Sequence, residues 1–132
     1  MRIRILLALA LATYGGPGAT QPADWNGAQS LTIELSSFKF RPAALTLTQG
    51  TPYRLHFVNT AGGGHDFVAK AFFASSTIAP QDRGKLRDGS VDLEGGESAD
   101  IRLIPNRPGT YKSHCSHFMH SMFGMTGTVT VR

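Results

Sequence analysis

Apolar and polar residues alternate in short runs from Leu31 onward. Leu31, Ile33 and Leu35 occupy every second position, with Thr32 and Glu34 between them. Successive side chains of a strand point to opposite faces of a sheet, so this pattern predicts a half-buried β-strand. Further strands are predicted from strand-like runs at 45–48, 53–58, 65–69, 91–93, 101–104, 109–113 and 126–131.

Turn-forming residues separate these runs at regular intervals. Gly, Pro and Asn gather at 49–52, 59–64, 94–97 and 105–109. Seven or eight short strands without a long helical period are typical of an all-β sandwich. Residues 71–90 are the least strand-like part, and we expect a short helical or irregular insertion there, with Pro80 suited to a first helical position.

The N-terminus resembles a secretory signal. Arg2 and Arg4 precede a short apolar run at 5–12, which is well below the roughly 20 residues that span a bilayer. We predict a signal peptide at 1–12, a flexible leader at 13–29 and one domain at 30–132. The alternative is a retained N-terminal anchor. The product is expected to be periplasmic or secreted.

The charge of the chain is nearly balanced. The formal net charge of +4 falls to +2 when Arg2 and Arg4 are removed. Nucleic-acid or anionic-lipid binding calls for clustered basic residues, so neither is predicted. No other segment is apolar enough to cross a membrane, and we expect a monomer.

Residues 114–125 carry most of the soft side chains. They include the only cysteine, three of the five histidines and three of the four methionines. Thiolate, imidazole and thioether ligands together suit copper better than calcium or magnesium. A lone cysteine is often just a buried, inert side chain. With His and Met on both sides, metal ligation becomes the better interpretation.

Three residues of this stretch have regular spacing. Four residues separate Cys115 from His120, and four separate His120 from Met125. A loop of this length can fold back so that all three side chains converge on one ion. A further imidazole must come from elsewhere. His65, which begins a strand directly after a glycine run, is a better candidate than His56 within an alternating strand.

The pattern Tyr111-x-x-x-Cys115-x-x-x-x-His120-x-x-x-x-Met125-x-Gly127 resembles the ligand loop of cupredoxins, the blue-copper proteins. The spacing is similar to that of the rusticyanin, auracyanin and azurin types. The early segment Phe38-x-Phe40-x-Pro42-x-x-Leu45-Thr46-Leu47-x-x-Gly50 and the segment Gly64-His65-Asp66-Phe67 resemble other strands of the family. The resemblance covers about residues 30–132.

This resemblance implies a Greek-key sandwich of two sheets with one type 1 copper ion. It implies that His65, Cys115 and His120 bind copper in a plane, with Met125 axial and the Gly64 carbonyl as an extra weak contact. The family cycles Cu(I) and Cu(II) as a one-electron carrier and passes electrons to a redox partner through the exposed edge of His120. The protein is therefore predicted not to be an enzyme.

Asp66 departs from the Asn or Ser that often follows the first histidine in this family. A carboxylate there could accept hydrogen bonds from the ligand loop, and we hypothesise that it lowers the reduction potential. Tyr111 is expected to close the corner before the cysteine strand.

Other interpretations of the loop stay open. The extra soft groups could form a second metal site in a copper-buffering, delivery or tolerance protein with copper-handling partners; these groups are His114, His117, Met119 and Met122. Phe118, Met119, Met122 and Phe123 could be core residues or an apolar rim around His120. His114 beside Cys115 also resembles multicopper oxidases, and a Cys–His pair could serve a protease.

Overall fold

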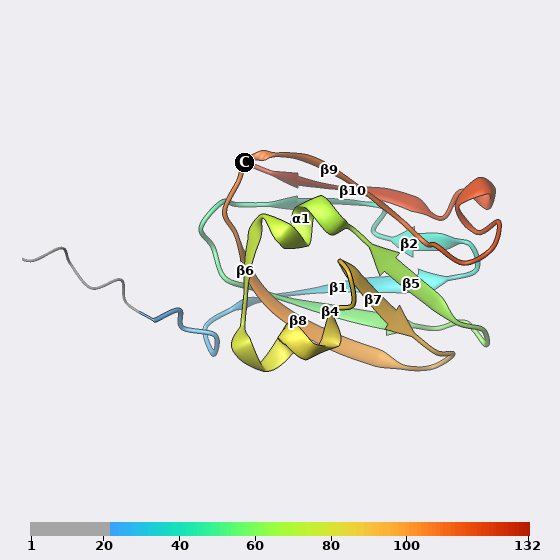
Figure 1. Ribbon diagram of the computed structural model, residues 1–132, viewed down its shortest axis with the longest axis horizontal. Coiled ribbons are helices and arrows are strands. Elements are labelled where there is room, and N and C mark those ends of the chain that lie inside the picture. Colours follow the sequence, from blue (N-terminus) through green and yellow to red (C-terminus); the bar gives the residue numbers. More distant parts are fainter. Residues whose placement is uncertain (1–21) are drawn as a thin grey trace, which may run out of the picture.

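A computed structural model describes residues 22–132 as two five-stranded sheets packed face to face (Figure 1). The predicted signal peptide at 1–12 and most of the predicted leader lie outside the described residues. The first strand begins at Gln29, next to the predicted start of the domain. In the part of the chain described, no helix is long and apolar enough to cross a membrane.

The first sheet has the strand order β2-β1-β4-β8-β6. Its strands are β1 (Gln29–Ser36), β2 (Lys39–Arg41), β4 (Tyr53–Asn59), β8 (Ser98–Pro105) and β6 (Ser76–Ile78). β1 pairs in parallel with β4 and antiparallel with β2, which places the β1–β2 turn at one end of the sandwich.

The second sheet has the order β3-β10-β9-β5-β7 and carries the soft side chains. Its strands are β3 (Ala44–Leu47), β10 (Thr126–Val131), β9 (Gly109–His114), β5 (His65–Val68) and β7 (Ser90–Leu93). The predicted β-sandwich is confirmed. Residues 22–132 form ten strands rather than seven or eight, because β2 and β6 have three residues each and are too short to show alternation.

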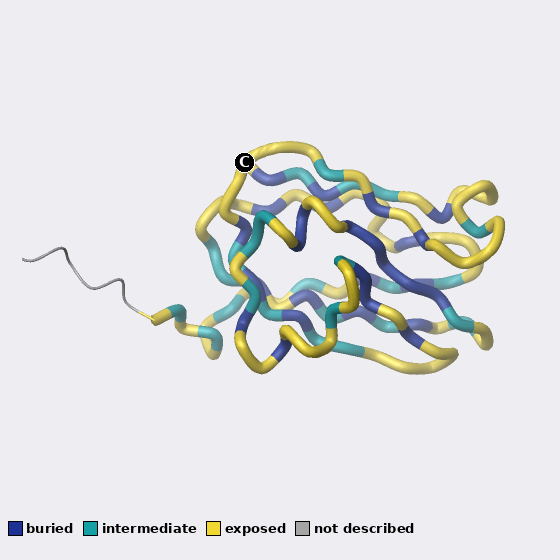
Figure 2. The backbone as a smooth tube through the Cα atoms, in the orientation of Figure 1, coloured by how far each residue is buried: buried dark blue, intermediate teal, exposed yellow. Residues whose placement is uncertain are grey.

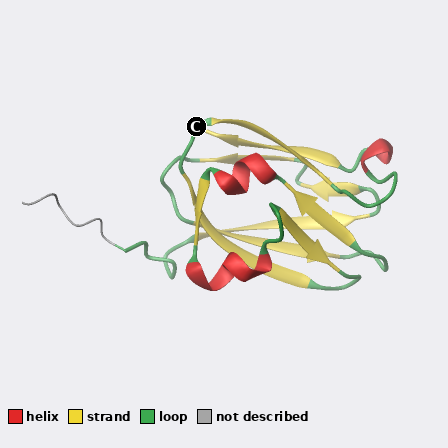
Figure 3. Cartoon of the chain, viewed as in Figure 1, coloured by secondary structure: helices red, strands yellow, loops and turns green. Residues whose placement is uncertain are grey.

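The described part of the chain also has three short helices (Figure 3): α1 (Lys70–Ala74), η1 (Pro80–Lys85) and η2 (Ser121–Phe123). Two of them lie in the predicted insertion at 71–90, where Pro80 starts η1 as expected. The third lies in the β9–β10 loop.

The core lies between the two sheets, where the dark-blue segments of Figure 2 face each other. Ile33 and Leu35, predicted to share a face, are both fully buried. The rings of Phe40 and Phe57 both pack against Phe67, at centroid distances of 5.1 and 5.0 Å. Burying a large apolar side chain contributes about 1.5–3 kcal/mol, so this contact joins the two sheets strongly.

Tyr111 makes the corner contact that the sequence predicts. Its hydroxyl donates a hydrogen bond to the carbonyl of Arg107 at 2.8 Å and accepts one from Ser75 at 3.3 Å. The start of β9 is thereby held to the preceding turn and to the end of α1. This strand then runs to the cysteine at the far end of the sandwich (Figure 1).

Candidate metal centre

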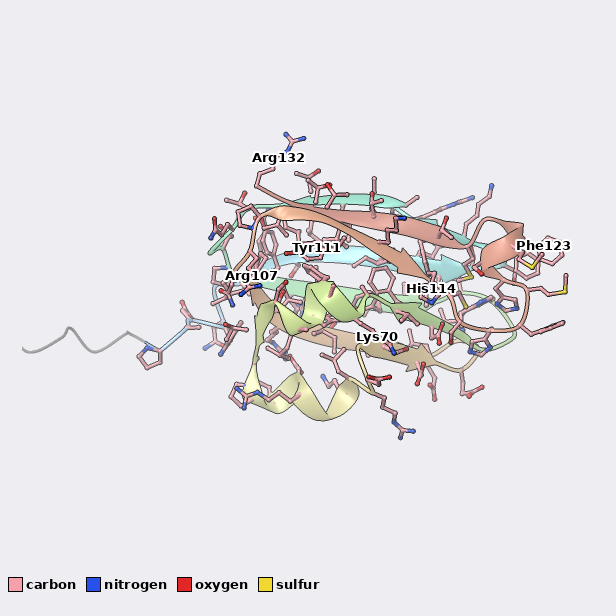
Figure 4. The ribbon with its side chains drawn as sticks, turned by 45° about the horizontal axis from the view of Figure 1, so that its top comes forward. Lys70, Arg107, Tyr111, His114, Phe123 and Arg132 are labelled. Atoms are coloured by element: carbon pink, nitrogen blue, oxygen red, sulfur yellow. The ribbon has the colours of Figure 1, made fainter. Side chains whose placement is uncertain are left out.

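The soft side chains meet at one end of the sandwich. The β9–β10 loop (residues 115–125) closes this end, and the start of β5 and the β1–β2 turn lie beside it (Figure 1). Figure 4 places Phe123 at this end, with Tyr111 and Arg107 toward the other. Three separate parts of the chain therefore supply the surroundings of the site.

His65 is the first residue of β5 and is 1% exposed. Strand pairing with Leu93 on β7 holds its backbone in place. The Nδ1 atom of its ring lies 3.8 Å from the Sγ atom of Cys115, and the Nε2 atom lies 3.2 Å from the Oγ atom of Ser37. One ring nitrogen thus faces the cysteine while the other faces a hydroxyl group.

Cys115 follows β9 directly and is fully buried. Its Sγ atom lies 3.5 Å from the Nδ1 atom of His120. One ligand atom from each of His65, Cys115 and His120 lies within 4.8 Å of the other two. Among residues 22–132, this is the one group of three His, Cys, Asp or Glu side chains that is close enough to hold a metal ion.

Met125 closes the loop between Cys115 and β10. Its carbonyl accepts the backbone N–H of Cys115 at 3.0 Å, and its own N–H donates to the carbonyl of His120 at 3.1 Å. Gly124, with φ at 94°, provides the left-handed turn that ends η2 just before it. The Met125 side chain is fully buried. Its axial role and the Gly64 carbonyl contact stay predictions.

Burial changes the acid–base properties of two of these groups. Burial lowers the pKa of the His65 imidazole, and the nearby His120 and His117 rings lower it further, against an opposing effect of Asp66. His65 is therefore held in the neutral form that binds metals. Burial raises the pKa of the Cys115 thiol, so a metal ion that binds there must displace its proton.

Asp66 holds the residue after the cysteine. Its carboxylate accepts the backbone N–H of Ser116 at 2.6 Å and also accepts the Ser116 hydroxyl. These are the hydrogen bonds predicted for this position, and they link β5 to the β9–β10 loop. His65 and Cys115, two potential ligands, are thus each followed in the chain by one residue of the hydrogen-bonded pair Asp66 and Ser116.

Within the described residues, His114 and His117 do not join other His, Cys, Asp or Glu side chains in a second group of three close enough to hold a metal ion. His114 is exposed, and His117 stacks on His120 with a centroid distance of 5.5 Å and an interplanar angle of 19°. His56 lies outside the loop, on β4 of the other sheet, where its Nδ1 atom is within hydrogen-bond distance of Asp100 Oδ1, at 2.6 Å. This position agrees with the prediction that His56 is a weaker ligand candidate than His65.

The apolar loop residues form a rim rather than core. Phe118, Met122 and Phe123 are 88%, 78% and 60% exposed, and Met119 is 39% exposed. Only the two ends of the β9–β10 loop enter the core, where Cys115 and Met125 are fully buried, whereas these four side chains lie in the exposed part between them. His120, in the same loop, is half-buried, and its ring contacts Phe38, which in turn packs on Phe123.

The cupredoxin-like domain family matches residues 4–131 of the chain. The chain belongs to the cupredoxin family. Among curated relatives of this cupredoxin, auracyanin-B of Chloroflexus aurantiacus (strain ATCC 29366 / DSM 635 / J-10-fl) is 27% identical over 143 residues. That match covers 94% of the present chain and 61% of the relative, so the chain spans about three-fifths of the relative's length.

Solved structures also match the fold of this chain. An auracyanin B structure has a TM-score of 0.59 and 26% identity, covering 80% of this cupredoxin and 89% of that chain. The McoA multicopper oxidase of Aquifex aeolicus has a TM-score of 0.63 and 18% identity, covering 87% of this chain and 32% of the oxidase. The second likeness shows a shared fold alone.

The donor atoms of this cupredoxin fit one type 1 copper ion. Bonds of about 2.0–2.3 Å from imidazole and thiolate to a first-row ion place the donors of a trigonal plane roughly 3.6 Å apart. The two sulfur–nitrogen distances, 3.8 and 3.5 Å, bracket that value. The hydrogen bonds around Cys115 and His120 hold these donors at one place in the fold.

Proposed function

We propose that this protein is an exported type 1 copper protein that carries single electrons and transforms no substrate. His65, Cys115, His120 and Met125 are its copper ligands. The proposal rests mainly on one observation, the convergence of two imidazole nitrogens on a buried cysteine sulfur at 3.8 and 3.5 Å. The bound copper supplies a one-electron Cu(I)/Cu(II) couple.

The surroundings of the ligands suit rapid electron transfer. Backbone hydrogen bonds from Met125 tie both Cys115 and His120 into one closed loop, and Asp66 ties the loop to β5. Donors held in this way move little when the charge on the metal changes. A small structural change on oxidation or reduction keeps the barrier to electron transfer low.

The route out of the site is His120. Its ring is half-buried, whereas His65 and Cys115 are 1% and 0% exposed. The ring of Phe38 contacts His120 and packs on Phe123, and the same loop exposes the apolar side chains of Phe118 and Met122. Exposed apolar patches mark contact surfaces. The partner is therefore a redox protein with an apolar docking face around its own electron-accepting group.

Export to the periplasm or the medium is supported by Arg2, Arg4 and the apolar run at 5–12. The family match begins at residue 4, so it includes this run and does not separate it from the domain. N-terminal sequencing of protein recovered from the periplasmic fraction tests export. A mature chain that retains residues 1–12 would contradict cleavage.

Protein-film voltammetry tests the electron-carrier function. The copper-loaded protein is expected to give a reversible one-electron wave, with fast electron self-exchange detected by NMR line broadening. The matched variant Cys115→Ser should lose the wave, because the strong thiolate ligand is gone. An irreversible wave, or self-exchange too slow to detect, would contradict the carrier function even if copper binds.

A second candidate function is copper buffering or delivery to copper-handling partners. The exposed soft side chains His114, His117, Met119 and Met122 favour it. Replacing these four together tests it. Unchanged copper stoichiometry and unchanged copper tolerance of the host would leave the carrier function alone. If both fall while the reversible voltammetric wave persists, these four side chains bind additional copper.

A further inference from the structure

Beside the copper ligands, the two-residue turn Ser37–Phe38 between β1 and β2 contacts both histidines. β1 ends at Ser36 and β2 begins at Lys39, and this turn lies at the same end of the sandwich as the β9–β10 loop (Figure 1). Ser37 and Phe38 come from the opposite sheet to His65 and Cys115. The turn is thus a third support of the site, independent of β5 and of the loop.

Ser37 contacts the ring nitrogen of His65 that faces away from the cysteine. The Ser37 Oγ atom lies 3.2 Å from Nε2, while Nδ1 of the same ring lies 3.8 Å from Cys115 Sγ. If Nδ1 is to offer its lone pair to a metal, Nε2 must carry the proton. The Ser37 oxygen is placed to accept that proton in a hydrogen bond, which selects this tautomer and prevents the ring from turning.

Phe38 contacts the other imidazole. Its ring meets His120 edge-on, with a centroid distance of 4.9 Å and an interplanar angle of 67°, and it also packs on Phe123 at 5.2 Å. Edge-to-face pairs of this kind contribute beyond the area they bury. His120 therefore lies between Phe38 on one side and the stacked ring of His117 on another, at 5.5 Å.

We propose that the Ser37–Phe38 turn is a positioning element of the metal centre: Ser37 fixes the tautomer and orientation of His65, and Phe38 fixes the ring of His120. Neither residue touches the metal. Partners of this type orient metal-binding histidines, and their loss typically costs 10–100-fold in metal affinity. This inference rests on the proposed function, because it takes both histidines as copper ligands.

Matched variants at position 37 test the hydroxyl group. Ser37→Thr keeps the hydroxyl group. Ser37→Val places a side chain of the same shape as threonine there but lacks the hydroxyl group. Ser36→Ala alters the neighbouring serine, whose side chain makes no hydrogen bond in the described structure. Copper affinity is measured by competition with a chelator. We expect roughly tenfold weaker binding in Ser37→Val and Ser37→Ala, and wild-type binding in Ser37→Thr and Ser36→Ala.

Nitrogen NMR of the metal-free protein provides a second readout that needs no copper. At a pH where the ring is neutral, His65 is expected as the tautomer with the proton on Nε2, and Ser37→Val should convert it into a mixture of tautomers. A proton on Nδ1 in the wild type would overturn the proposal. So would unchanged copper affinity in Ser37→Val, or equal losses in Ser37→Val and Ser37→Thr.

Variants at position 38 test the second contact. Phe38→Ala is expected to broaden the copper EPR spectrum and to weaken copper binding several-fold, and Phe38→Tyr, which retains the ring, should restore both. A Phe38→Ala spectrum identical to that of the wild type would overturn this half of the proposal. If the wild type itself shows no thiolate-to-copper band, the proposed function fails, while the NMR readout still decides the role of Ser37.

Discussion

The Asp66 carboxylate accepts the backbone N–H of Ser116 at 2.6 Å, although the two residues are 50 positions apart in the chain. Asp66 follows His65, and Ser116 follows Cys115. One hydrogen bond therefore fixes the distance between the strand that carries the first histidine and the loop that begins at the cysteine. The same carboxylate places a negative charge close to the proposed copper ion.

Asp66→Asn is expected to raise the reduction potential by roughly 40 mV. A nearby carboxylate stabilises Cu(II), the more positive state, and its effect at this range is about 1 kcal/mol. The amide oxygen of Asn can still accept the Ser116 N–H, so the geometry is kept. Asp92→Asn is the control, since Asp92 pairs opposite Asp66 on β7 but does not bond the loop. Voltammetry showing an unchanged or lower potential in Asp66→Asn would refute this effect.

Asp82→Asn is expected to destabilise the fold in a pH-dependent manner. Asp82 is fully buried and pairs with Lys85 at 2.7 Å and Arg102 at 2.9 Å. Burial opposes ionisation, but hydrogen bonds from Lys85 and Arg102 outweigh it and lower the pKa of the Asp82 carboxyl below its ordinary value of 3.8.

The lowered pKa sets the direction of this pH effect. The contribution of the Asp82 carboxylate is complete above the pKa of the unfolded chain, and it is lost as the pH falls through the lower pKa of the folded state. Urea denaturation at pH 7 should show a loss of about 2 kcal/mol in the free energy of unfolding of the variant. A difference that persisted undiminished at pH 2 would contradict the assignment.

Gly127→Ala is expected to lower the free energy of unfolding by about 2 kcal/mol. A Cβ atom at Gly127 would lie 2.4 Å from the carbonyl oxygen of Ala43, so β10 and the segment before β3 would have to separate. Gly84→Ala is the control, because a Cβ atom there meets nothing within 4 Å. Equal urea midpoints for the two variants would show that the close approach is unimportant.

The double change Phe118→Ser with Met122→Ser is expected to slow electron self-exchange roughly tenfold, which corresponds to about 1.4 kcal/mol of lost docking energy. Both side chains are exposed and neither packs in the core, so potential and stability should not change. Arg107→Ser, at the opposite end of the sandwich (Figure 4), is the control. Self-exchange at the wild-type rate would rule out the apolar rim as the docking surface.

The local pattern of the sequence predicts much of this fold. Alternation identifies the strands that bury one face, such as Leu31, Ile33 and Leu35 in β1, because a half-buried strand must alternate. It does not identify β2 and β6, since a three-residue strand is too short to alternate visibly. The rim residues of the loop were equally compatible with a core, because an apolar side chain does not show by itself whether a sheet covers it.

The site was predictable where it depends on spacing along the chain. Cys115, His120 and Met125 lie in one loop, and the glycines before His65 mark where that strand begins. Ser37 and Phe38 gave no such signal. Their contacts with His65 and His120 arise from the packing of a turn of one sheet against the end of the other, and such contacts between distant segments have no local pattern.

The most direct test of the metal centre is the visible absorption and EPR of the mature protein loaded with one equivalent of Cu(II), measured beside Cys115→Ser. We expect an intense thiolate-to-copper band with a narrow copper hyperfine splitting, reversible on reduction and absent from Cys115→Ser. A weak ligand-field spectrum that is the same in both proteins would contradict it, because the buried cysteine would then take no part in binding copper.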